Sequence, residues 1–550
     1  MGSRPCGRYS DDGQDRRIMS VEEGSRGDLE LGTIPKLVEI AAARHQDRPA
    51  IVDGETTLTF NGLAEQSRRM AKALIASDIQ HGDRIAIWAP NMLEWVVAAL
   101  GVHSVGGVVV PINTRYKGLE AAYLLEKSEA RLLFTVTDFL GTDYVALLRD
   151  AKPELPALLD VVVLRGQAPR GTLALDALLA RGKEISDEEA ERRRDAVQPD
   201  DLCDILFTSG TTGKPKGGMC THAQNLRAFH DWSTIVGLCA LDRYLVVVPF
   251  FHSFGYKAGW LSALMMGATV YPQPVFDVGE VLEAIAKHAI TMLPGPPALY
   301  QTILARPDLE RFDLSSLRLA VTGAASIPVE LIHKMRDVLG FETVVTAYGL
   351  TESTGIATIC RRDDDAELVA HTSGRAFPGL EVRVVDDDRH EVPRGEPGEI
   401  LVRGYSVMKG YFDEPERTRE AIDEDGWLHT GDVGVMDERG YLQITDRIKD
   451  MFIVGGFNAY PAEIENILST HEAIAEVAVV GMPDERLGEV GAAFVVLKPG
   501  ATLTEQELIE WSRNAMANFK VPRKVELLGA LPRNATGKVL KFELRKRVGA

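Results

Sequence analysis

Apolar and polar positions alternate with two different periods from residue 29 onward. Some stretches carry apolar side chains at the spacing of an amphipathic helix, and others are short apolar runs typical of buried strands. The two kinds follow one another in turn, which predicts parallel β-α-β construction. We expect helices over 33–44, 61–77 and 94–105, a hairpin around Asp53-Gly54, and strands over 84–88 and 107–111.

The alternation returns between 244 and 345 and predicts a second α/β subdomain. Its strands are expected at 244–248, 268–271, 292–293 and 317–321. From 374 to 445, glycine and proline interrupt short strands, as in a small β-rich unit. Beyond that unit we expect a compact α+β domain with a helix opened by Pro461, strands at 477–480 and 493–497, and a helix begun by a Thr504–Glu507 capping box.

Composition and charge narrow the class of protein. Hydrophobic residues make up 45% and charged residues 26%, which are ordinary values for a globular protein. The net charge of −19 gives a nucleic-acid partner no electrostatic attraction. No apolar run is long enough to span a bilayer, and the polar residues 1–28 lack the apolar segment of a signal peptide. We therefore expect a cytoplasmic protein with a disordered leader over 1–28.

A loop rich in Ser, Thr, Gly and Lys follows the apolar run 205–207 and covers 208–217. Small residues let backbone amides approach phosphate oxygens closely, and Lys214 and Lys216 add positive charge. The kinase-type loop needs a glycine five positions before Gly213 and a hydroxyl residue after Lys214. Those positions hold Thr208 and Pro215, so this is a different way of holding a polyphosphate.

Further segments complete a recognisable set in one order along the chain. They are 251–255 (FHSFG), 346–352 (TAYGLTE), 426–434 (GWLHTGDVG), 446–450 (DRIKD), 455–465 (GGFNAYPAEIE) and 532–538 (PRNATGK). Together with the loop, they resemble the motifs of the adenylate-forming superfamily, which includes acyl-CoA synthetases, peptide-synthetase adenylation domains and beetle luciferases. The resemblance implies a large N-terminal domain over 29–446, built from two α/β subdomains and a β-barrel, and a small mobile α+β domain over 447–550.

The resemblance also implies roles for individual residues in ATP-dependent activation of a carboxylic acid. Lys538, Glu352 and Thr208 are the expected catalytic residues, and Glu352 and Thr208 are expected at Mg2+. Lys449 is the expected hinge between half-reactions. Nucleotide and cofactor contacts are expected from Thr208, Ser209, Gly210, Thr211, Thr212, Gly213, Lys216, Gly323, Ala324, Ala325, Tyr348, Gly349, Thr351, Asp432, Arg447, Lys449, Gly455 and Gly456.

The acid and its acceptor are less sharply defined by the sequence. His252, Phe251, Tyr256 and Gly349 are expected to line the acyl site, followed along the chain by Lys257. Coenzyme A is the expected thiol; transfer to a carrier protein, oxidation of the acyl group and a nonenzymatic binding module are the alternatives. Segments 250–259 and 293–300 are similar to those of actinobacterial ligases for a bicyclic propanoate from sterol breakdown. A medium- or long-chain fatty acid is the other candidate, and a homodimer is left open.

Overall fold

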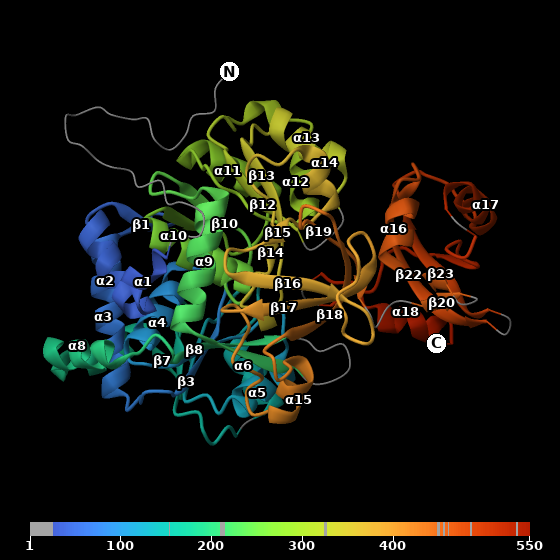
Figure 1. Ribbon diagram of the computed structural model, residues 1–550. Coiled ribbons are helices and arrows are strands. Elements are labelled where there is room, and N and C mark those ends of the chain that lie inside the picture. Colours follow the sequence, from blue (N-terminus) through green and yellow to red (C-terminus); the bar gives the residue numbers. More distant parts are fainter. Residues whose placement is uncertain are drawn as a thin grey trace. The chain divides into compact units, whose positions relative to one another are not determined.

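The computed structural model describes residues 26–152, 154–208, 215–323, 327–447, 452–454, 457–459, 461–484, 487–516, 518–534 and 537–549 (Figure 1). The chain divides into two compact units. The first runs to Glu381 and includes Val402–Leu428, and the second comprises Val382–Leu401 and the chain from His429 onward. Each unit is described separately below.

A seven-stranded sheet carries the first predicted α/β subdomain. Its order is β7-β6-β5-β3-β4-β8-β9, and its strands are parallel except at the β8–β9 hairpin. The strands are β3 (Arg84–Trp88), β4 (Val108–Pro111), β5 (Leu132–Thr135), β6 (Asp160–Val163), β7 (Leu173–Ala174), β8 (Leu202–Thr208) and β9 (Lys216–Thr221). Every residue of β4 and β5 is buried, which explains why both read as continuous apolar runs.

The second predicted subdomain contains two further sheets of orders β10-β11-β1-β2 and β12-β13-β14-β15. Their strands are β1 (Pro49–Asp53), β2 (Thr56–Thr59), β10 (Arg243–Val246), β11 (Thr269–Pro272), β12 (Leu319–Thr322), β13 (Thr343–Tyr348), β14 (Thr358–Ile359) and β15 (Arg375–Ala376). Parallel bridges from Met292 to Tyr244 and to Leu319 join β10 and β12. The predicted 50–60 hairpin is confirmed by antiparallel β1 and β2.

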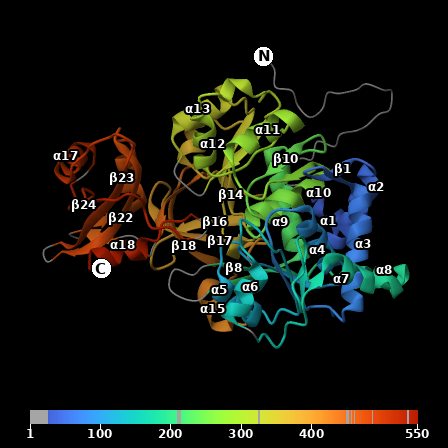
Figure 2. The same cartoon turned by 180° about the vertical axis from the view of Figure 1, so that it is seen from behind.

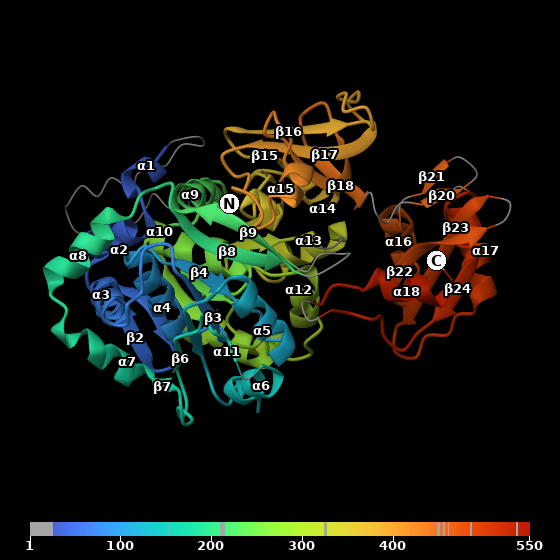
Figure 3. The same ribbon diagram turned by 90° about the horizontal axis from the view of Figure 1, so that it is seen from below.

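Helices cover the faces of these sheets (Figures 2 and 3). They are α1 (Asp28–Leu31), α2 (Ile34–His45), α3 (Phe60–Ala76), α4 (Leu93–Ser104), α5 (Gly118–Lys127), α6 (Tyr144–Ala151), α7 (Leu175–Arg181), α8 (Asp187–Ala196), α9 (His222–Val236), α10 (Ser262–Met266), α11 (Val278–His288), α12 (Pro297–Leu304), α13 (Val329–Asp337), α14 (Ala366–His371) and α15 (Pro415–Ala421). The helices predicted over 33–44, 61–77 and 94–105 are confirmed as α2, α3 and α4.

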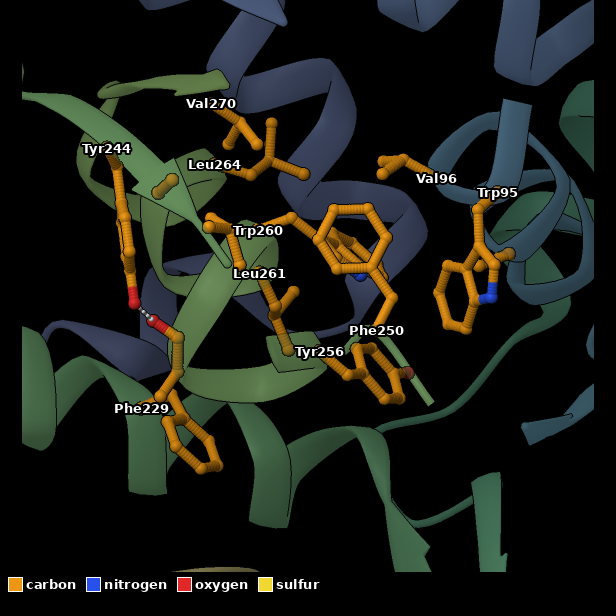
Figure 4. Packing of buried hydrophobic residues seen from close by; sticks show 14 of the residues in the cluster. Trp95, Val96, Phe229, Tyr244, Phe250, Tyr256, Trp260, Leu261, Leu264 and Val270 are labelled. Atoms are coloured by element: carbon orange, nitrogen blue, oxygen red, sulfur yellow. Dashed lines mark hydrogen bonds between the residues drawn. The ribbon is translucent and has the colours of Figure 1, made fainter. Parts of the chain in front are cut away.

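Aromatic side chains fill the core where α4 meets the segment after β10. Trp95 packs edge-on against Phe250, Tyr256 and Trp260, with ring centroids 5.6 to 6.0 Å apart (Figure 4). Tyr256 and Trp260 belong to η2 (Phe254–Leu261), a π-helix with non-helical backbone at Gly259. The sequence did not predict this helix, and π-helices in proteins are frequently found at functional sites.

The β-rich segment forms a sheet of order β16-β17-β18-β19, as the punctuated strands predicted. Its strands are β16 (Leu380–Val385), β17 (Pro397–Gly404), β18 (Leu428–Met436) and β19 (Leu442–Arg447).

The C-terminal part of the second unit is an α+β fold, as predicted. Its strands are β20 (Phe452–Val454), β21 (Phe457–Ala459), β22 (Ile474–Asp484), β23 (Gly488–Leu497) and β24 (Lys524–Leu527), and its helices are α16 (Pro461–Ser469), α17 (Glu505–Ala515) and α18 (Lys541–Arg547). The capping box is confirmed, because Thr504 accepts from the Glu507 amide and the Glu507 side chain accepts from the Thr504 amide. Ile464, Leu468, Val479, Phe494 and Leu508 are among its fully buried core side chains.

Candidate active site

The base of the predicted phosphate loop is a strand hairpin. Thr208 ends β8 and lies in register with Lys216, the first residue of β9. Both side chains are half-buried. Of the predicted loop residues, Ser209, Gly210, Thr211, Thr212 and Gly213 lie outside the described residues. The described hairpin therefore defines where the loop leaves and re-enters the sheet.

The strand that follows the loop is paired with a later segment of the first unit. The Met219 amide donates to the Gly410 carbonyl at 3.0 Å, and the Phe412 amide donates to the Gly217 carbonyl at 2.8 Å. Tyr411 lies between the two bonded residues Gly410 and Phe412, and the Lys216 ammonium is 5.0 Å from the centroid of its ring. A cation over an aromatic face is attracted to it. The segment 409–412, which contains Tyr411, thus lies beside the β8–β9 hairpin.

Tyr411 connects this hairpin to the predicted metal ligand Glu352. The Tyr411 hydroxyl donates to Glu352 Oε1 at 2.8 Å, and the Met408 amide donates to the Glu352 carbonyl at the same distance. Burial, and then the Glu352 charge, raise the pKa of Tyr411, so the phenol keeps its proton and remains a donor. The motif analysis missed Tyr411. Its only signal was an aromatic pair, Tyr411-Phe412, between glycine and aspartate.

The Glu352 turn has a strained backbone. Glu352 lies in the 3-10 helix η4 (Thr351–Ser353), and the next residue, Thr354, has φ 57° and ψ 9°. A β-branched residue is rare in this left-handed region. Thr354 is fully buried, and its hydroxyl donates to the Ser406 carbonyl at 2.6 Å. Thr351 belongs to the same site, because a Cβ on Gly218 would lie 3.3 Å from its methyl group.

Two of the residues expected at the nucleotide, Tyr348 and Gly323, lie where two parallel strands end. Tyr348 is the half-buried last residue of β13, and Gly323 follows β12. A Cβ on Gly323 would lie 3.0 Å from the Ala347 carbonyl oxygen, and one on Gly349 only 2.3 Å from the Gly355 carbonyl oxygen. The backbone is therefore closely packed here. Ala324 and Ala325 lie outside the described residues.

The segment expected at the acyl site begins at the carboxyl-terminal end of β10. The His252 side chain is exposed, yet surrounding protein lowers its pKa by desolvation. Phe251 beside it is half-buried. A Cβ on Gly355 would lie 3.4 Å from the Ser253 hydroxyl, so this segment adjoins the turn after Glu352. Strand ends of parallel sheets are where α/β proteins bind ligands.

Tyr256, also expected at the acyl site, lies in the interior. It is fully buried, and its hydroxyl is 2.9 Å from His103 Nε2 on α4. The structure therefore places Tyr256 among the aromatic core side chains, one helical turn away from exposed His252.

The second unit holds the remaining predicted residues. Asp432 on β18 is buried and lies in register with Arg447 on β19. Lys538 is exposed, and its amide donates to Asn534 Oδ1 at 2.9 Å while its carbonyl accepts from the Asn534 amide at 2.8 Å. The Arg447 side chain and residues Lys449, Gly455 and Gly456 lie outside the described residues.

Comparison with known proteins gives two family matches. The model described as "AMP-binding enzyme" matches residues 38–412, and "AMP-binding enzyme C-terminal domain" matches 463–538. In the part of the chain that the structure describes, no helix combines the length and apolar character needed to cross a membrane.

Individual relatives cover nearly the whole chain. A methyl-dioxo-octahydroindenyl-propanoyl:CoA ligase of Rhodococcus jostii (strain RHA1) is 49% identical over 94% of this chain and 98% of its own. The ligase of the same name from Mycobacterium tuberculosis is 48% identical over 94% and 99%. The crystal structure of ATP-bound MatB from Rhodopseudomonas palustris matches with a TM-score of 0.82 and 30% identity, covering 94% of this chain and 99% of that one.

Proposed function

The chain belongs to the AMP-binding enzyme family and is an AMP-forming acyl-CoA synthetase, and from this premise we propose that its acid is a bulky, ring-bearing propanoate. The supporting observation is the near-half identity, over almost the full length, to two ligases named for a bicyclic propanoate. The proposal places the enzyme in the degradation of steroid-derived rings. Medium- and long-chain fatty acids are the competing substrates.

The reaction proceeds in two steps. The acid carboxylate attacks the α-phosphorus of ATP, which forms acyl-AMP and releases pyrophosphate, and the thiolate of coenzyme A then displaces AMP. We propose that Thr208, the loop after it and Lys216 hold the leaving phosphates by backbone amides, hydroxyls and charge. In the first step, Lys538 bridges the carboxylate and the α-phosphate as a compact cation on a flexible stem.

Magnesium fits the donor set around Glu352. No group of three or more His, Cys, Asp or Glu side chains within the described ranges could hold a metal ion. Glu352 nevertheless offers a carboxylate, oriented by Tyr411, beside the Thr208–Lys216 hairpin. Mg2+ commonly takes one or two protein carboxylates and completes its shell with phosphate and water oxygens. Bound there with Thr208 nearby, it would neutralise charge on the polyphosphate.

The remaining assignments form one proposal about the nucleotide and the mobile domain. Tyr348 would lie against adenine, with Gly323, Ala324 and Ala325 on its other side. Asp432 would hydrogen-bond the ribose hydroxyls, and Arg447 would reach the ribose or the α-phosphate. We propose an adenylation domain over 29–446 and a C-terminal domain over 447–550 that rotates at Lys449, so that Gly455 and Gly456 replace Lys538 for thiol attack. We also propose that the enzyme is cytoplasmic and forms a homodimer.

Pyrophosphate release over a panel of acids tests the proposed substrate. The panel should contain ring-bearing propanoates, straight-chain acids of matched carbon number and aromatic acids. We expect kcat/KM for a bicyclic propanoate to exceed that for the matched straight chain by at least about a hundredfold, or ~3 kcal/mol of transition-state discrimination. A straight-chain acid as the best substrate would overturn the proposal. AMP release with and without coenzyme A separates ligation from adenylation alone.

A further inference from the structure

Two opposite charges lie in the core between the phosphate-loop strand and the acyl-site segment. The Lys257 ammonium is 3.1 Å from Asp204 Oδ1, and both side chains are completely buried. Asp204 lies on β8, four residues before Thr208, and Lys257 lies on η2, five residues after His252. The pair therefore joins β8, which ends at Thr208 in the proposed ATP site, to η2, which begins just after His252 in the proposed acid site.

The pair is built into its surroundings. Asp204 Oδ2 accepts a hydrogen bond from the Asn225 side chain at 2.5 Å, which leaves Oδ1 facing Lys257. The Lys257 carbonyl accepts from the Ser262 hydroxyl at 2.9 Å. The negative charge of Asp204 outweighs burial and raises the pKa of Lys257, so the ammonium stays charged. Removing two charges from water is costly, and apolar side chains of similar volume often stabilise a core equally well.

The two partners are held to different degrees by their own backbones. β8 is paired with β4 on one side and β9 on the other, so sheet hydrogen bonds fix it without the ion pair. η2 is a π-helix whose backbone has non-helical torsion angles at Gly259 (φ −82°, ψ −107°), so it is not a regular α-helix. The ion pair therefore anchors η2 to β8, and its loss would shift η2 in preference to β8.

We propose that Asp204 and Lys257 are a positioning pair that fixes the acyl-site segment 251–256 against β8 and thereby sets the shape of the acid site. Lys257 acts through the segment before it and does not touch the acid. The inference rests on the proposed function, because it assigns 251–256 to the acid. It also predicts that the ATP side of the site is largely independent of the pair.

The test compares Asp204→Asn/Lys257→Met with Lys257→Met alone. The single change leaves Asp204 buried without its partner and should lower the melting temperature. The double change removes both charges and keeps an oxygen for Asn225, so it should melt close to wild type. In the folded double variant we expect the KM for the best acid to rise about tenfold and acid discrimination to fall about tenfold. The KM for ATP should stay within about twofold.

A second ion pair of the first unit, with one buried partner, supplies the control. Asp242 is buried and ion-paired with half-buried Arg318, and these residues precede β10 and β12 and lie outside β8 and η2. Asp242→Asn/Arg318→Met should leave acid KM and discrimination unchanged. A Lys257 double variant with wild-type acid KM and discrimination would overturn the positioning role, and so would an equal rise in the KM for both substrates. If the wild-type enzyme itself prefers straight-chain acids, the proposed substrate fails, while the best acid still tests the pair.

Discussion

The Tyr411 hydroxyl donates a 2.8 Å hydrogen bond to the carboxylate of Glu352. The same ring lies against the Lys216 ammonium, so one tyrosine contacts both the proposed metal ligand and a proposed phosphate ligand. Tyr411 is more than fifty residues from Glu352 along the chain, and it reaches the site because segment 409–412 pairs with β9. Its place in the site follows from tertiary structure alone.

Tyr411→Phe should weaken the use of Mg2+. The change removes one donor to a charged acceptor, an interaction typically worth about 1.5–3 kcal/mol. We expect kcat/KM for ATP at limiting Mg2+ to fall about tenfold, with partial recovery at saturating Mg2+. Initial rates of pyrophosphate release over a Mg2+ titration measure this. Tyr271→Phe, at a half-buried phenol, is the control, and an unchanged Mg2+ requirement would contradict the assignment.

Gly349→Ala should disrupt the turn that carries Glu352. The new Cβ would lie 2.3 Å from the Gly355 carbonyl oxygen, and the next nearest atoms are also backbone. Backbone cannot move aside as a flexible side chain can, so we expect at least about a hundredfold loss of adenylation. Gly529→Ala is the matched control, because a Cβ there has open space. Near-normal adenylation by a folded Gly349→Ala enzyme would show that the turn tolerates displacement.

Lys538→Ala should slow adenylation and spare thioester formation. Removing the bridging cation takes charge stabilisation from the first transition state only, so we expect at least about a hundredfold loss, or ~3 kcal/mol. Single-turnover assays with ATP and acid, and separately with preformed acyl-AMP and coenzyme A, distinguish the steps. Lys546→Ala, at another exposed lysine of the same domain, should change neither. Equal losses in both half-reactions would rule out a role specific to adenylation.

The sequence predicted the architecture because its signals are local. Helical spacing over 33–44 and the apolar runs 84–88 and 107–111 reflect which faces are buried, and the elements appear within one or two residues of these ranges. The α/β subdomains and the α+β C-terminal fold followed from the same patterns. The π-helix at 254–261 did not, because its apolar side chains fit an ordinary buried helix equally well.

The site was less predictable where partners are distant in sequence. Glu352 stood out through its motif, whereas Tyr411 had no motif and its partner is fixed by strand pairing. Asp204 and Lys257 each interrupt an apolar run, which signals a buried charge, but nothing in the sequence pairs them. Tyr256 was expected at the acid because it follows the 251–255 motif, and nothing in the sequence indicated that it is fully buried with its hydroxyl 2.9 Å from His103 Nε2.

Protonation of buried histidines should limit stability at low pH. Desolvation lowers the pKa of His222 to about 3, and that of His103 well below its ordinary value of 6.5. Below pH 6.5 the unfolded chain binds protons at these histidines while the folded chain does not, so stability falls as the pH falls. Above pH 6.5 neither state is protonated and the effect vanishes. Each histidine contributes roughly 1.4 kcal/mol per pH unit below 6.5.

His222→Asn should flatten this pH dependence. The His222 Nδ1 accepts from the Ile34 amide, and the asparagine oxygen can occupy a similar position without titrating. We expect the slope of unfolding free energy against pH, from urea titrations between pH 6 and 5, to fall by roughly 1.4 kcal/mol per pH unit, which corresponds to about one proton. His333→Gln, at an exposed histidine, should leave the slope unchanged. If His222→Asn leaves the slope at its wild-type value, His222 is protonated in the folded state and the buried imidazole is not the group that makes the fold acid-sensitive.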